Sequence, residues 1–243
     1  MNLIVDVGNT FIKLAVFNTE GHLVYDKAVK EEEWSKTIAD LQGEFKEITD
    51  CIISDVGGLA EAKISGLKAF YKVHVLSHDS RIPFVNKYGT PETLGVDRIA
   101  LVAAAAREYP LTNTLVIDAG SCITYDFINA KGEYLGGAIA PGLQMRFKAL
   151  HQFTAKLPLL ENSELNDFIG KDTNSSMISG VQNGMINEVE GIIGQYSQRF
   201  KDLTVILTGG DTQFLSKRLK NTIFANSKFI LGGLNYILEY NKH

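Results

Sequence analysis

The stretch IVDVGNTFIK, residues 4–13, is an apolar run that ends in an aspartate, a small residue and a glycine. A second stretch, VIDAGSCITY at residues 116–125, has the same arrangement, and Asp6 aligns with Asp118. Apolar residues alternate with other residues after each turn, which is typical of a returning β-strand. We therefore predict two β-hairpins with acidic, glycine-containing turns, and we interpret them as an internal duplication.

The two predicted hairpins match along most of their length, with a slip of about one residue. Lys13 of the first hairpin aligns with Tyr125 of the second, so only the first turn is followed by a cation. Because the identity is low, two unrelated strand-turn-strand units are an alternative to duplication. A boundary near Asn113 rests on this repeat alone and predicts one domain over residues 1–113 and another over 114–243.

The composition is that of an ordinary globular protein. The 243 residues are 45% apolar and 21% charged, with a formal net charge of −4. This balance argues against nucleic acid or an anionic membrane as the main partner, and no apolar run approaches the roughly 20 residues of a membrane span. Cys51 and Cys122 provide neither a disulfide framework nor a zinc site. The chain opens on a strand-like run with no leader, so we expect a cytoplasmic protein.

Strand-like and helix-like segments alternate along the chain, which predicts an α/β fold. Beyond the hairpin turns, strands are expected over residues 22–29, 50–54, 72–76, 133–138 and 204–207. Helices are expected over residues 31–45, 58–71, 95–108, 142–150 and 175–200, with a terminal helix after Gly232-Gly233. The longest helix contains Gly180, Gly184, Gly191 and Gly194. Glycines are unfavourable inside a helix, so they suggest a close-packed neighbour such as a second subunit.

The common nucleotide and metal motifs do not occur. The sequence has no G-x-x-x-x-G-K-[ST], no G-x-G-x-x-G and no H-E-x-x-H, which argues against a P-loop, a dinucleotide fold and a zinc protease site. His74 and His78 are four residues apart, but their segment alternates like a strand. They would therefore not share a helix face, and we do not expect a metal pair there.

The first acidic turn has the residue types that bind a phosphate with its metal. Asp6 can hold a divalent ion directly or through water. Gly8 lets backbone amides approach an oxyanion, and Asn9 and Thr10 add donors. Lys13, on the returning strand, would place a positive charge over the turn. The alternative is a plain hairpin with an Asx-type turn.

The second acidic turn contributes a carboxylate and a hydroxyl, Asp118 and Ser121, without a lysine. Two carboxylates at facing turns would suit a cation between them, although a duplicated structural hairpin is the alternative. Two glycine-rich loops follow. Residues 136–142 lead into a helix and suit an anion or nucleotide. Residues 208–211 could let the backbone lie along an adenine or ribose, or Asp211 could simply cap the next helix.

Residues 95–98, Gly-Val-Asp-Arg, open a predicted helix after a loop that contains Pro91. Asp97 would accept a proton from a hydroxyl, and Arg98 would hold a carboxylate through its bidentate fork. The alternative is a carboxylate matched to the helix N-terminus together with a surface ion pair.

Taken together, these segments resemble type III pantothenate kinase, a family within the superfamily of sugar kinases, actin and heat-shock ATPases. The resemblance spans nearly the whole chain in the family's order and approximate spacing. It is carried by residues 6–13, Tyr88 seven residues before Gly95, and residues 95–98, 118–121, 137–142 and 170–173. It implies two actin-like, ribonuclease H-like domains with mixed sheets flanked by helices and ATP in the cleft. It also implies a homodimer whose pantothenate site lies near the subunit interface.

The resemblance also implies roles for particular residues. ATP and its magnesium would contact Asp6, Val7, Gly8, Asn9, Thr10, Phe11, Ile12 and Lys13, with Asp6 acting on Mg²⁺ through water, and ATP would also contact Ser121. Pantothenate would contact Tyr88, Gly95, Val96, Asp97, Arg98 and Thr173, with Asp97 as proton acceptor. Asp118 would bind the monovalent cation, K⁺ or NH₄⁺. Ser121 departs from the family's usual threonine but keeps the hydroxyl, and Ala119 and Cys122 depart only in packing.

The predicted reaction is transfer of the γ-phosphoryl of ATP to the primary hydroxyl of pantothenate, the first step toward coenzyme A. One rival is another kinase or phosphohydrolase of the superfamily that acts on a sugar or polyphosphate. Arg98 distinguishes the two, because a neutral sugar offers it no carboxylate. The other rival is a non-catalytic regulator, which the acidic balance and the complete set of charged residues disfavour.

Overall fold

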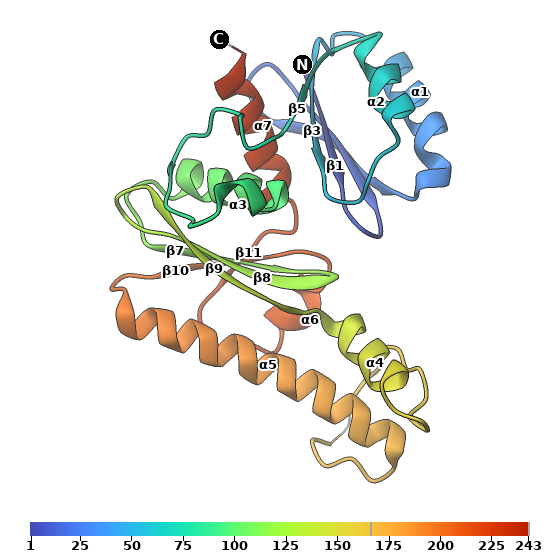
Figure 1. Cartoon of the computed structure of the whole chain (residues 1–243), viewed down its shortest axis with the longest axis vertical. Coiled ribbons are helices and arrows are strands. Elements are labelled where there is room, and N and C mark those ends of the chain that lie inside the picture. The colour runs from blue at the N-terminus through green and yellow to red at the C-terminus, as the bar shows by residue number, and fades with distance from the viewer. Residues whose placement is uncertain (166, 243) are drawn as a thin grey trace. The chain divides into compact units, whose positions relative to one another are not determined.

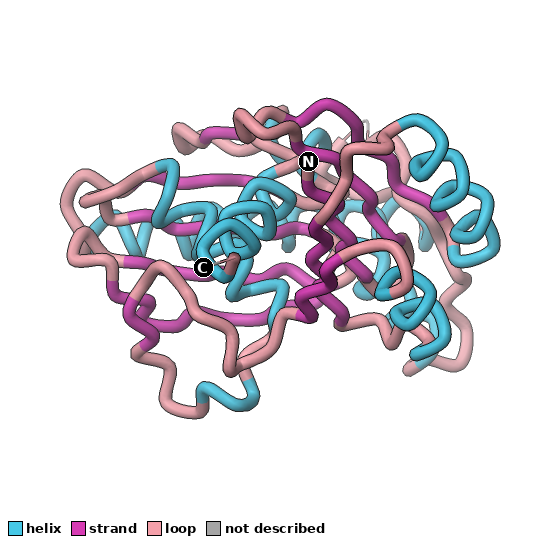
Figure 2. The backbone as a smooth tube through the Cα atoms, turned by 90° about the horizontal axis from the view of Figure 1, so that it is seen from above, coloured by secondary structure: helices cyan, strands magenta, loops and turns pink. Residues whose placement is uncertain are grey.

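The computed structural model describes residues 1–165 and 167–242, and it divides into two compact units (Figure 1). The first unit consists of Met1–Pro110, Gly132–Tyr134 and the residues from Phe229 onward. The second consists of Leu111–Lys131 and Leu135–Lys228. Strands, magenta in Figure 2, and helices, cyan, both contribute to the fold, as the α/β prediction requires.

The first unit is built on a five-stranded sheet in the order β3-β2-β1-β4-β5. Its strands are β1 (Asn2–Val7), β2 (Ile12–Phe17), β3 (Leu23–Val29), β4 (Asp50–Asp55) and β5 (Lys72–Val75). A short strand, β6 (Val85–Asn86), pairs in parallel with Glu133 and Tyr134. Its helices are η1 (Glu31–Glu33), α1 (Trp34–Glu44), α2 (Glu61–Lys68), η2 (Pro91–Thr93), α3 (Val96–Glu108) and α7 (Phe229–Asn241).

The alternation of side chains in β1 separates a core face from a functional face. Leu3, Val5 and Val7 belong to a buried cluster that also contains Trp34 and other residues of α1 and α2. Side chains at the intervening positions of β1 point to the opposite face, and they end with Asp6. The strand therefore places a buried aspartate near its carboxyl end, where the first turn begins.

Helix α7 packs on α3 and on strands β1 and β4 of the first unit. The predicted terminal helix is confirmed, but its predicted start after Gly232-Gly233 is wrong, because α7 begins at Phe229 and includes both glycines. A side chain at position 233 would overlap the carbonyl oxygen of Ala100 in α3, so close helix packing explains this glycine. Asn2 of β1 is tied to the same helix, since its side-chain amide donates to Asn235 at 2.6 Å.

The second unit is built on β7 (Thr114–Ala119), β8 (Cys122–Ile128), β9 (Glu133–Pro141), β10 (Thr204–Thr208) and β11 (Phe224–Ala225). Its helices are α4 (Leu143–Gln152), α5 (Thr173–Arg199) and α6 (Thr212–Ser216). In Figure 1 the long helix α5, in orange, runs along one face of this sheet. Its buried residues Val181, Met185 and Val189 share a core with the inward-facing side chains of β7 and β8.

The two units repeat one strand arrangement. The second sheet has six strands in the order β11-β10-β7-β8-β9-β6, and its first five strands match β5-β4-β1-β2-β3 of the first sheet. In each unit the first hairpin is antiparallel, and its first strand pairs in parallel with a later strand, β4 or β10. This common topology supports the duplication inferred from the two acidic turns.

The register corrects one detail of the predicted repeat. Lys13 lies opposite Asp6, but the residue opposite Asp118 is Thr124, and Tyr125 lies opposite Ile117. The reason is loop length, because four residues separate the last register pair of the first hairpin, Val7 and Ile12, whereas three separate Ala119 and Ile123.

The compact units of the structure and the repeat in the sequence give different domain boundaries. The repeat suggests 1–113 and 114–243, whereas packing places α7 in the first unit because it covers α3.

Helix α2 is also shorter than the expected 58–71, since the Asp55 carboxylate accepts the backbone N–H groups of Gly58 and Leu59 at 2.7 and 2.8 Å. None of the helices within residues 1–165 and 167–242 has the length and apolar character needed to span a membrane.

Candidate active site

The first acidic turn holds an ion pair at the end of the β1–β2 hairpin. Asp6 and Lys13 face each other across the hairpin, and the Lys13 ammonium lies 3.1 Å from Oδ2 of Asp6. The Asp6 side chain is almost buried, whereas that of Lys13 is 37% exposed. A buried carboxylate is thus held by a cation that is still accessible from outside, an arrangement suited to a bound phosphate and its metal.

The backbone of this turn is compact, and its outer residues are exposed. The amide of Gly8 donates to the carbonyl of Phe11 at 3.1 Å, and Asn9, Thr10 and Phe11 are all exposed. Val7 and Ile12 are buried as partners in the hairpin. The side chains of Val7 and Ile12 therefore serve the core, which leaves a ligand only the backbone at these two positions.

A second loop lies against this turn, and sequence analysis missed it. The N–H groups of Val56 and Gly57 both donate to the carbonyl of Val7 at 3.1 Å, and a side chain at position 57 would overlap the carbonyl of Gly8. The signal was present in the sequence, because Asp55-Val56-Gly57 repeats the Asp-Val-Gly of the first turn. The parallel pairing of Asp6 with Ser54 brings this loop into place.

Asp97 lies in the first turn of α3, close to the first acidic turn. Its carboxylate folds back over the N-cap residue Gly95 and accepts the backbone N–H of Arg98 at 2.8 Å. Burial raises the pKa of Asp97, and the negative charge of Asp6 raises it further. Two segments that the sequence separates by ninety residues thus place their carboxylates in electrostatic contact, with Asp97 poised to bind a proton.

Arg98 and Tyr88 form the neighbouring part of this site. Arg98 is 4% exposed, so the alternative of a surface ion pair does not describe it. Its guanidinium carbon lies 5.6 Å from the centroid of the Tyr88 ring, and that ring stacks on Tyr134. Two of the residues predicted to hold pantothenate, Tyr88 and Arg98, therefore lie together, and the aromatic contact helps to orient the arginine. Val96, the first residue of α3, is half-buried.

The second acidic turn is surrounded by the two glycine-rich loops of its own unit. The amide of Gly142, at the start of α4, donates to the carbonyl of Ser121 at 3.2 Å. The amide of Asp211 donates to the carbonyl of Ala119 at 2.9 Å, and a side chain at Gly209 would overlap that carbonyl and the Asp118 carboxylate. All three segments that sequence analysis assigned to nucleotide binding in this half therefore meet at one place.

Asp211 has a different role from the expected cap of the following helix. Its side chain makes no capping hydrogen bond to α6. The carboxylate instead accepts the backbone N–H of Leu143 at the start of α4, and burial raises its pKa. Asp211 therefore links the loop after β10 to the N-terminus of α4.

Hydroxyl groups flank Asp118 on both sides. Thr124 lies opposite it on β8, and Thr208 lies beside it on β10, so the three side chains share one face of the sheet. The Thr124 hydroxyl is buried and has no hydrogen-bond partner among the described residues. Such a buried oxygen beside a carboxylate fits a ligand for a monovalent cation.

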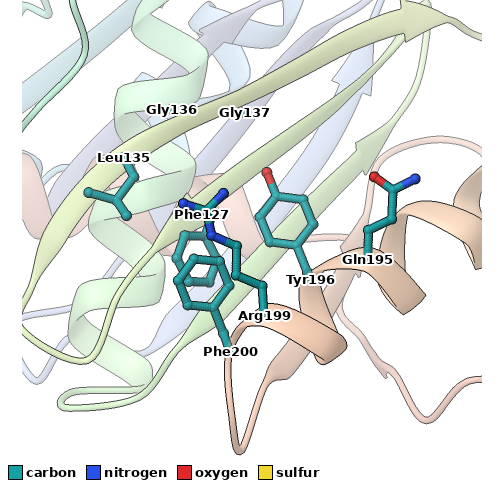
Figure 3. Close-up of a pocket in the computed structure, with 8 residues that line it drawn as sticks. All are labelled: Phe127, Leu135, Gly136, Gly137, Gln195, Tyr196, Arg199 and Phe200. Carbon is teal, nitrogen blue, oxygen red and sulfur yellow. The ribbon is translucent and has the colours of Figure 1, made fainter.

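Among the pockets that the described residues form, two in the second unit differ in their relation to the predicted site. A cavity of about 930 Å³ lies between α4 and α5 and is lined by Thr173, Arg146 and Met177 among others. Thr173 is the first residue of α5 and is exposed. The pocket in Figure 3, of about 470 Å³, lies where the end of α5 approaches β8 and β9. Its lining is Phe127, Leu135, Gly136, Gly137, Gln195, Tyr196, Arg199 and Phe200, which includes two glycines of the loop at residues 136–142 but no residue of the acidic turns or of the predicted pantothenate site.

The described residues contain no group of three or more His, Cys, Asp or Glu side chains that could hold a metal ion by themselves. Magnesium is commonly bound through one or two carboxylates together with the substrate's phosphates. Asp6 therefore fits a magnesium ion that arrives with a nucleotide.

Solved structures with a similar backbone place the chain in a class. A Campylobacter jejuni protein described as a Baf family transcriptional activator has a TM-score of 0.63 and 23% identity, with 98% of each chain covered. A Sinorhizobium meliloti protein assigned as a 2-dehydro-3-deoxygalactonokinase has a TM-score of 0.61 and 13% identity, with 99% of each chain covered. These likenesses show the fold alone, and with the duplicated sheets and acidic turns they define the actin-like sugar kinase fold.

Sequence comparison then identifies the family. The sequence model of type III pantothenate kinase matches residues 2–195. A protein of that name from Christiangramia forsetii is 50% identical over 242 residues, which cover 100% of this chain and 99% of the relative. The chain therefore belongs to the type III pantothenate kinase family, whose members are enzymes that phosphorylate pantothenate with ATP. The resemblance noted from the sequence is confirmed.

Proposed function

We propose that this chain transfers the γ-phosphoryl group of ATP to the primary hydroxyl of pantothenate, as the first step of coenzyme A biosynthesis. Family membership supports the reaction, and one observation carries the assignment of residues. We expect Asp97 to accept the hydroxyl proton and Asp6 to act on the phosphates through magnesium. The negative charge of Asp6 contributes to the raised pKa of Asp97, so the two carboxylates interact. Direct transfer requires the proton acceptor and the phosphates to meet at one substrate hydroxyl, and the electrostatic interaction of these two carboxylates supports that arrangement.

In this proposal the first acidic turn holds the phosphates of ATP. Phosphoryl transfer depends mainly on positioning and on neutralising charge. Lys13, the amides of the turn and the exposed Asn9 and Thr10 would contact phosphate oxygens. Asp6 would orient the water shell of magnesium, which supplies positive charge to the phosphates. When ATP binds, Lys13 would divide its interaction between Asp6 and the phosphate, which its partial exposure permits.

Pantothenate is proposed to bind at the start of α3. The buried guanidinium of Arg98 would hold the substrate carboxylate through its fork, and the Tyr88 ring, stacked on Tyr134, would keep that fork in one orientation. Asp97 would then take the proton of the hydroxyl as the new phosphate ester bond forms. The backbone of Gly95 and Val96 and the side chain of Thr173 are the remaining proposed contacts.

The second acidic turn is proposed to bind ATP through Ser121 and a monovalent cation through Asp118. The buried hydroxyl of Thr124 beside Asp118 supports the cation, because oxygen atoms are the ligands that K⁺ requires and NH₄⁺ can donate to. The cation would supply positive charge near the phosphates.

We also propose a homodimer. Support comes from α5, where Gly180, Gly184 and Gly191 are exposed with open space beside them. Phe153 and Phe168 are 81% and 73% exposed in the same unit, which is unusual for phenylalanines in a monomer.

Light scattering after size exclusion should give a mass near 54 kDa, about twice the 26.8 kDa of one chain. A mass near one chain at micromolar concentration would contradict the dimer. A cytoplasmic location is part of the same proposal.

One assay tests the proposed reaction against its rivals. ADP formation from ATP is measured with and without pantothenate, and with K⁺ present or replaced by Na⁺. We expect ADP to form only when pantothenate is present and faster with K⁺. ADP formation with glucose but not with pantothenate would favour a sugar kinase. No ADP formation with any acceptor, from a folded protein, would favour a regulator.

A further inference from the structure

We infer that Arg146 is a positioning residue that fixes the second acidic turn of the ATP site through the Pro141–Gly142 peptide. The inference rests on the proposed ATP contact of Ser121. Arg146 lies in α4, one turn after the helix begins, and its side chain is 18% exposed. Nothing in the motif analysis singled it out.

Arg146 makes two different hydrogen bonds with its guanidinium. Nε donates to the carbonyl of Pro141 at 2.9 Å, and Nη2 donates to Oε2 of Glu188 in α5 at 2.7 Å. A guanidinium presents its donors in a rigid plane, so the carboxylate fixes the direction in which Nε points. Glu188 therefore orients Arg146 toward Pro141, the residue before Gly142 in the glycine-rich loop.

The target of Arg146 is one half of a rigid peptide unit. In a trans peptide the carbonyl of one residue and the N–H of the next lie in one plane and point in opposite directions. The Pro141 carbonyl is held by Arg146, and the Gly142 N–H donates to the carbonyl of Ser121 at 3.2 Å. Rotation of this peptide would break both bonds, so holding its carbonyl also holds the N–H that supports the acidic turn.

The other side of the network is anchored in the core. The Tyr125 hydroxyl donates to Oε1 of Glu188 at 3.1 Å. Burial and the neighbouring Glu188 charge raise the pKa of Tyr125, so its hydroxyl keeps its proton. Glu188 thus accepts from two sides, and strand β8, helix α4 and helix α5 are joined at one carboxylate. A network with both carboxylate oxygens bonded holds its members in one geometry.

This arrangement predicts an effect on ATP and none on pantothenate. Arg146→Lys keeps the charge, but one ammonium cannot replace the planar fork that reaches Pro141 and Glu188 together. We expect the KM for ATP to rise about tenfold, in line with a hydrogen bond to a charged group, while the KM for pantothenate changes less than about twofold. Glu188→Gln keeps the shape and one acceptor oxygen, which can still accept from Arg146, but it replaces the other oxygen with an NH2 donor and removes the charge, so it should raise the KM for ATP by a smaller factor.

The decisive measurement is the double variant Arg146→Lys/Glu188→Gln. If Glu188 acts through Arg146, the double variant should have nearly the same KM for ATP as Arg146→Lys alone, because effects within one network are not additive. The matched control is Arg199→Lys at the far end of α5 (Figure 3), which should leave both KM values unchanged. Thermal unfolding of each variant shows whether it is folded, and Tyr125→Phe provides a milder change if Arg146→Lys does not fold.

Three outcomes would overturn the inference. The first is a rise in the KM for pantothenate rather than ATP, which would make Arg146 a substrate contact in the cavity that it lines. The second is a double variant whose effects multiply. The third is an unchanged KM for ATP in folded Arg146→Lys and Tyr125→Phe. The unmodified protein's activity with pantothenate is measured in the same series, so failure of the proposed function is seen there and not in the variants.

Discussion

Replacing Asp97 with asparagine should separate catalysis from stability. The amide oxygen of asparagine can still accept the Arg98 N–H that Asp97 accepts at 2.8 Å, so the start of α3 should be preserved. The substitution removes the proton acceptor, a loss that typically reduces turnover about 10²–10⁴-fold, or roughly 2.7–5.4 kcal/mol at 1.36 kcal/mol per factor of ten. The KM for ATP should change little, because the first acidic turn is not altered.

The thermal stability of Asp97→Asn should be kept or increased, although its turnover falls. Burial and Asp6 raise the pKa of Asp97 in the folded protein. The ionised carboxylate therefore opposes folding once the pH is above the ordinary aspartate value, and this cost grows until the raised pKa is passed. Asp97→Asn removes the charge, so its Tm at neutral pH should equal or exceed that of the unmodified protein. Asp202→Asn, on an exposed loop after α5, controls for the loss of one carboxylate and should leave turnover unchanged.

The assay is steady-state ADP formation at saturating ATP and pantothenate, with calorimetry on the same samples. Turnover of the unmodified protein should fall as the pH is lowered through the raised pKa of Asp97, and the residual turnover of Asp97→Asn should lack that fall. Full turnover in Asp97→Asn would refute the role of Asp97 as base. A large loss of Tm would refute the reasoning that its charge is unfavourable in the fold.

Three further changes test other parts of the site. Arg98→Lys keeps the charge but loses the fork, so the KM for pantothenate should rise by about tenfold or more with kcat less affected, and a defect confined to kcat would argue against a carboxylate contact. Thr124→Val removes the buried hydroxyl beside Asp118 and should abolish most activation by K⁺ without lowering Tm; undiminished activation would remove Thr124 from the cation site. Gly57→Ala places a methyl group where it overlaps the Gly8 carbonyl, so the KM for ATP should rise severalfold, whereas Gly66→Ala, with open space in α2, should leave it unchanged and add up to about 1 kcal/mol of stability.

Local pattern predicted most of the elements of this fold. The hairpins at Asp6 and Asp118 and the helix that starts near Gly95 all follow from side-chain alternation and turn residues within a few positions. The predicted start of α7 was wrong because Gly232 and Gly233, considered alone, indicate a break in the helix. Packing on Ala100, which is far away in the sequence, overrides that local preference.

The candidate site was predicted only where its residues stand in motifs. Asp97 and Arg98 were found through the Gly-Val-Asp-Arg motif and Tyr88 through the family resemblance, and the structure brings Tyr88 and Arg98 together. The loop at Gly57 was missed because its place beside Gly8 depends on the parallel register of β1 with β4, which no local pattern reveals. Arg146 was missed for the same reason, since its role depends on a carboxylate 42 positions away.

The placement of α7 has a consequence for how the protein is made. The first unit's sheet is complete once β5 has been synthesised, but the helix that covers α3 begins at Phe229. During synthesis on the ribosome, the apolar surface of β1 and α3 that α7 covers therefore stays exposed until nearly the whole polypeptide has emerged. We expect nascent chains stalled before Phe229 to bind chaperones and to be cut readily by proteases within their first hundred residues.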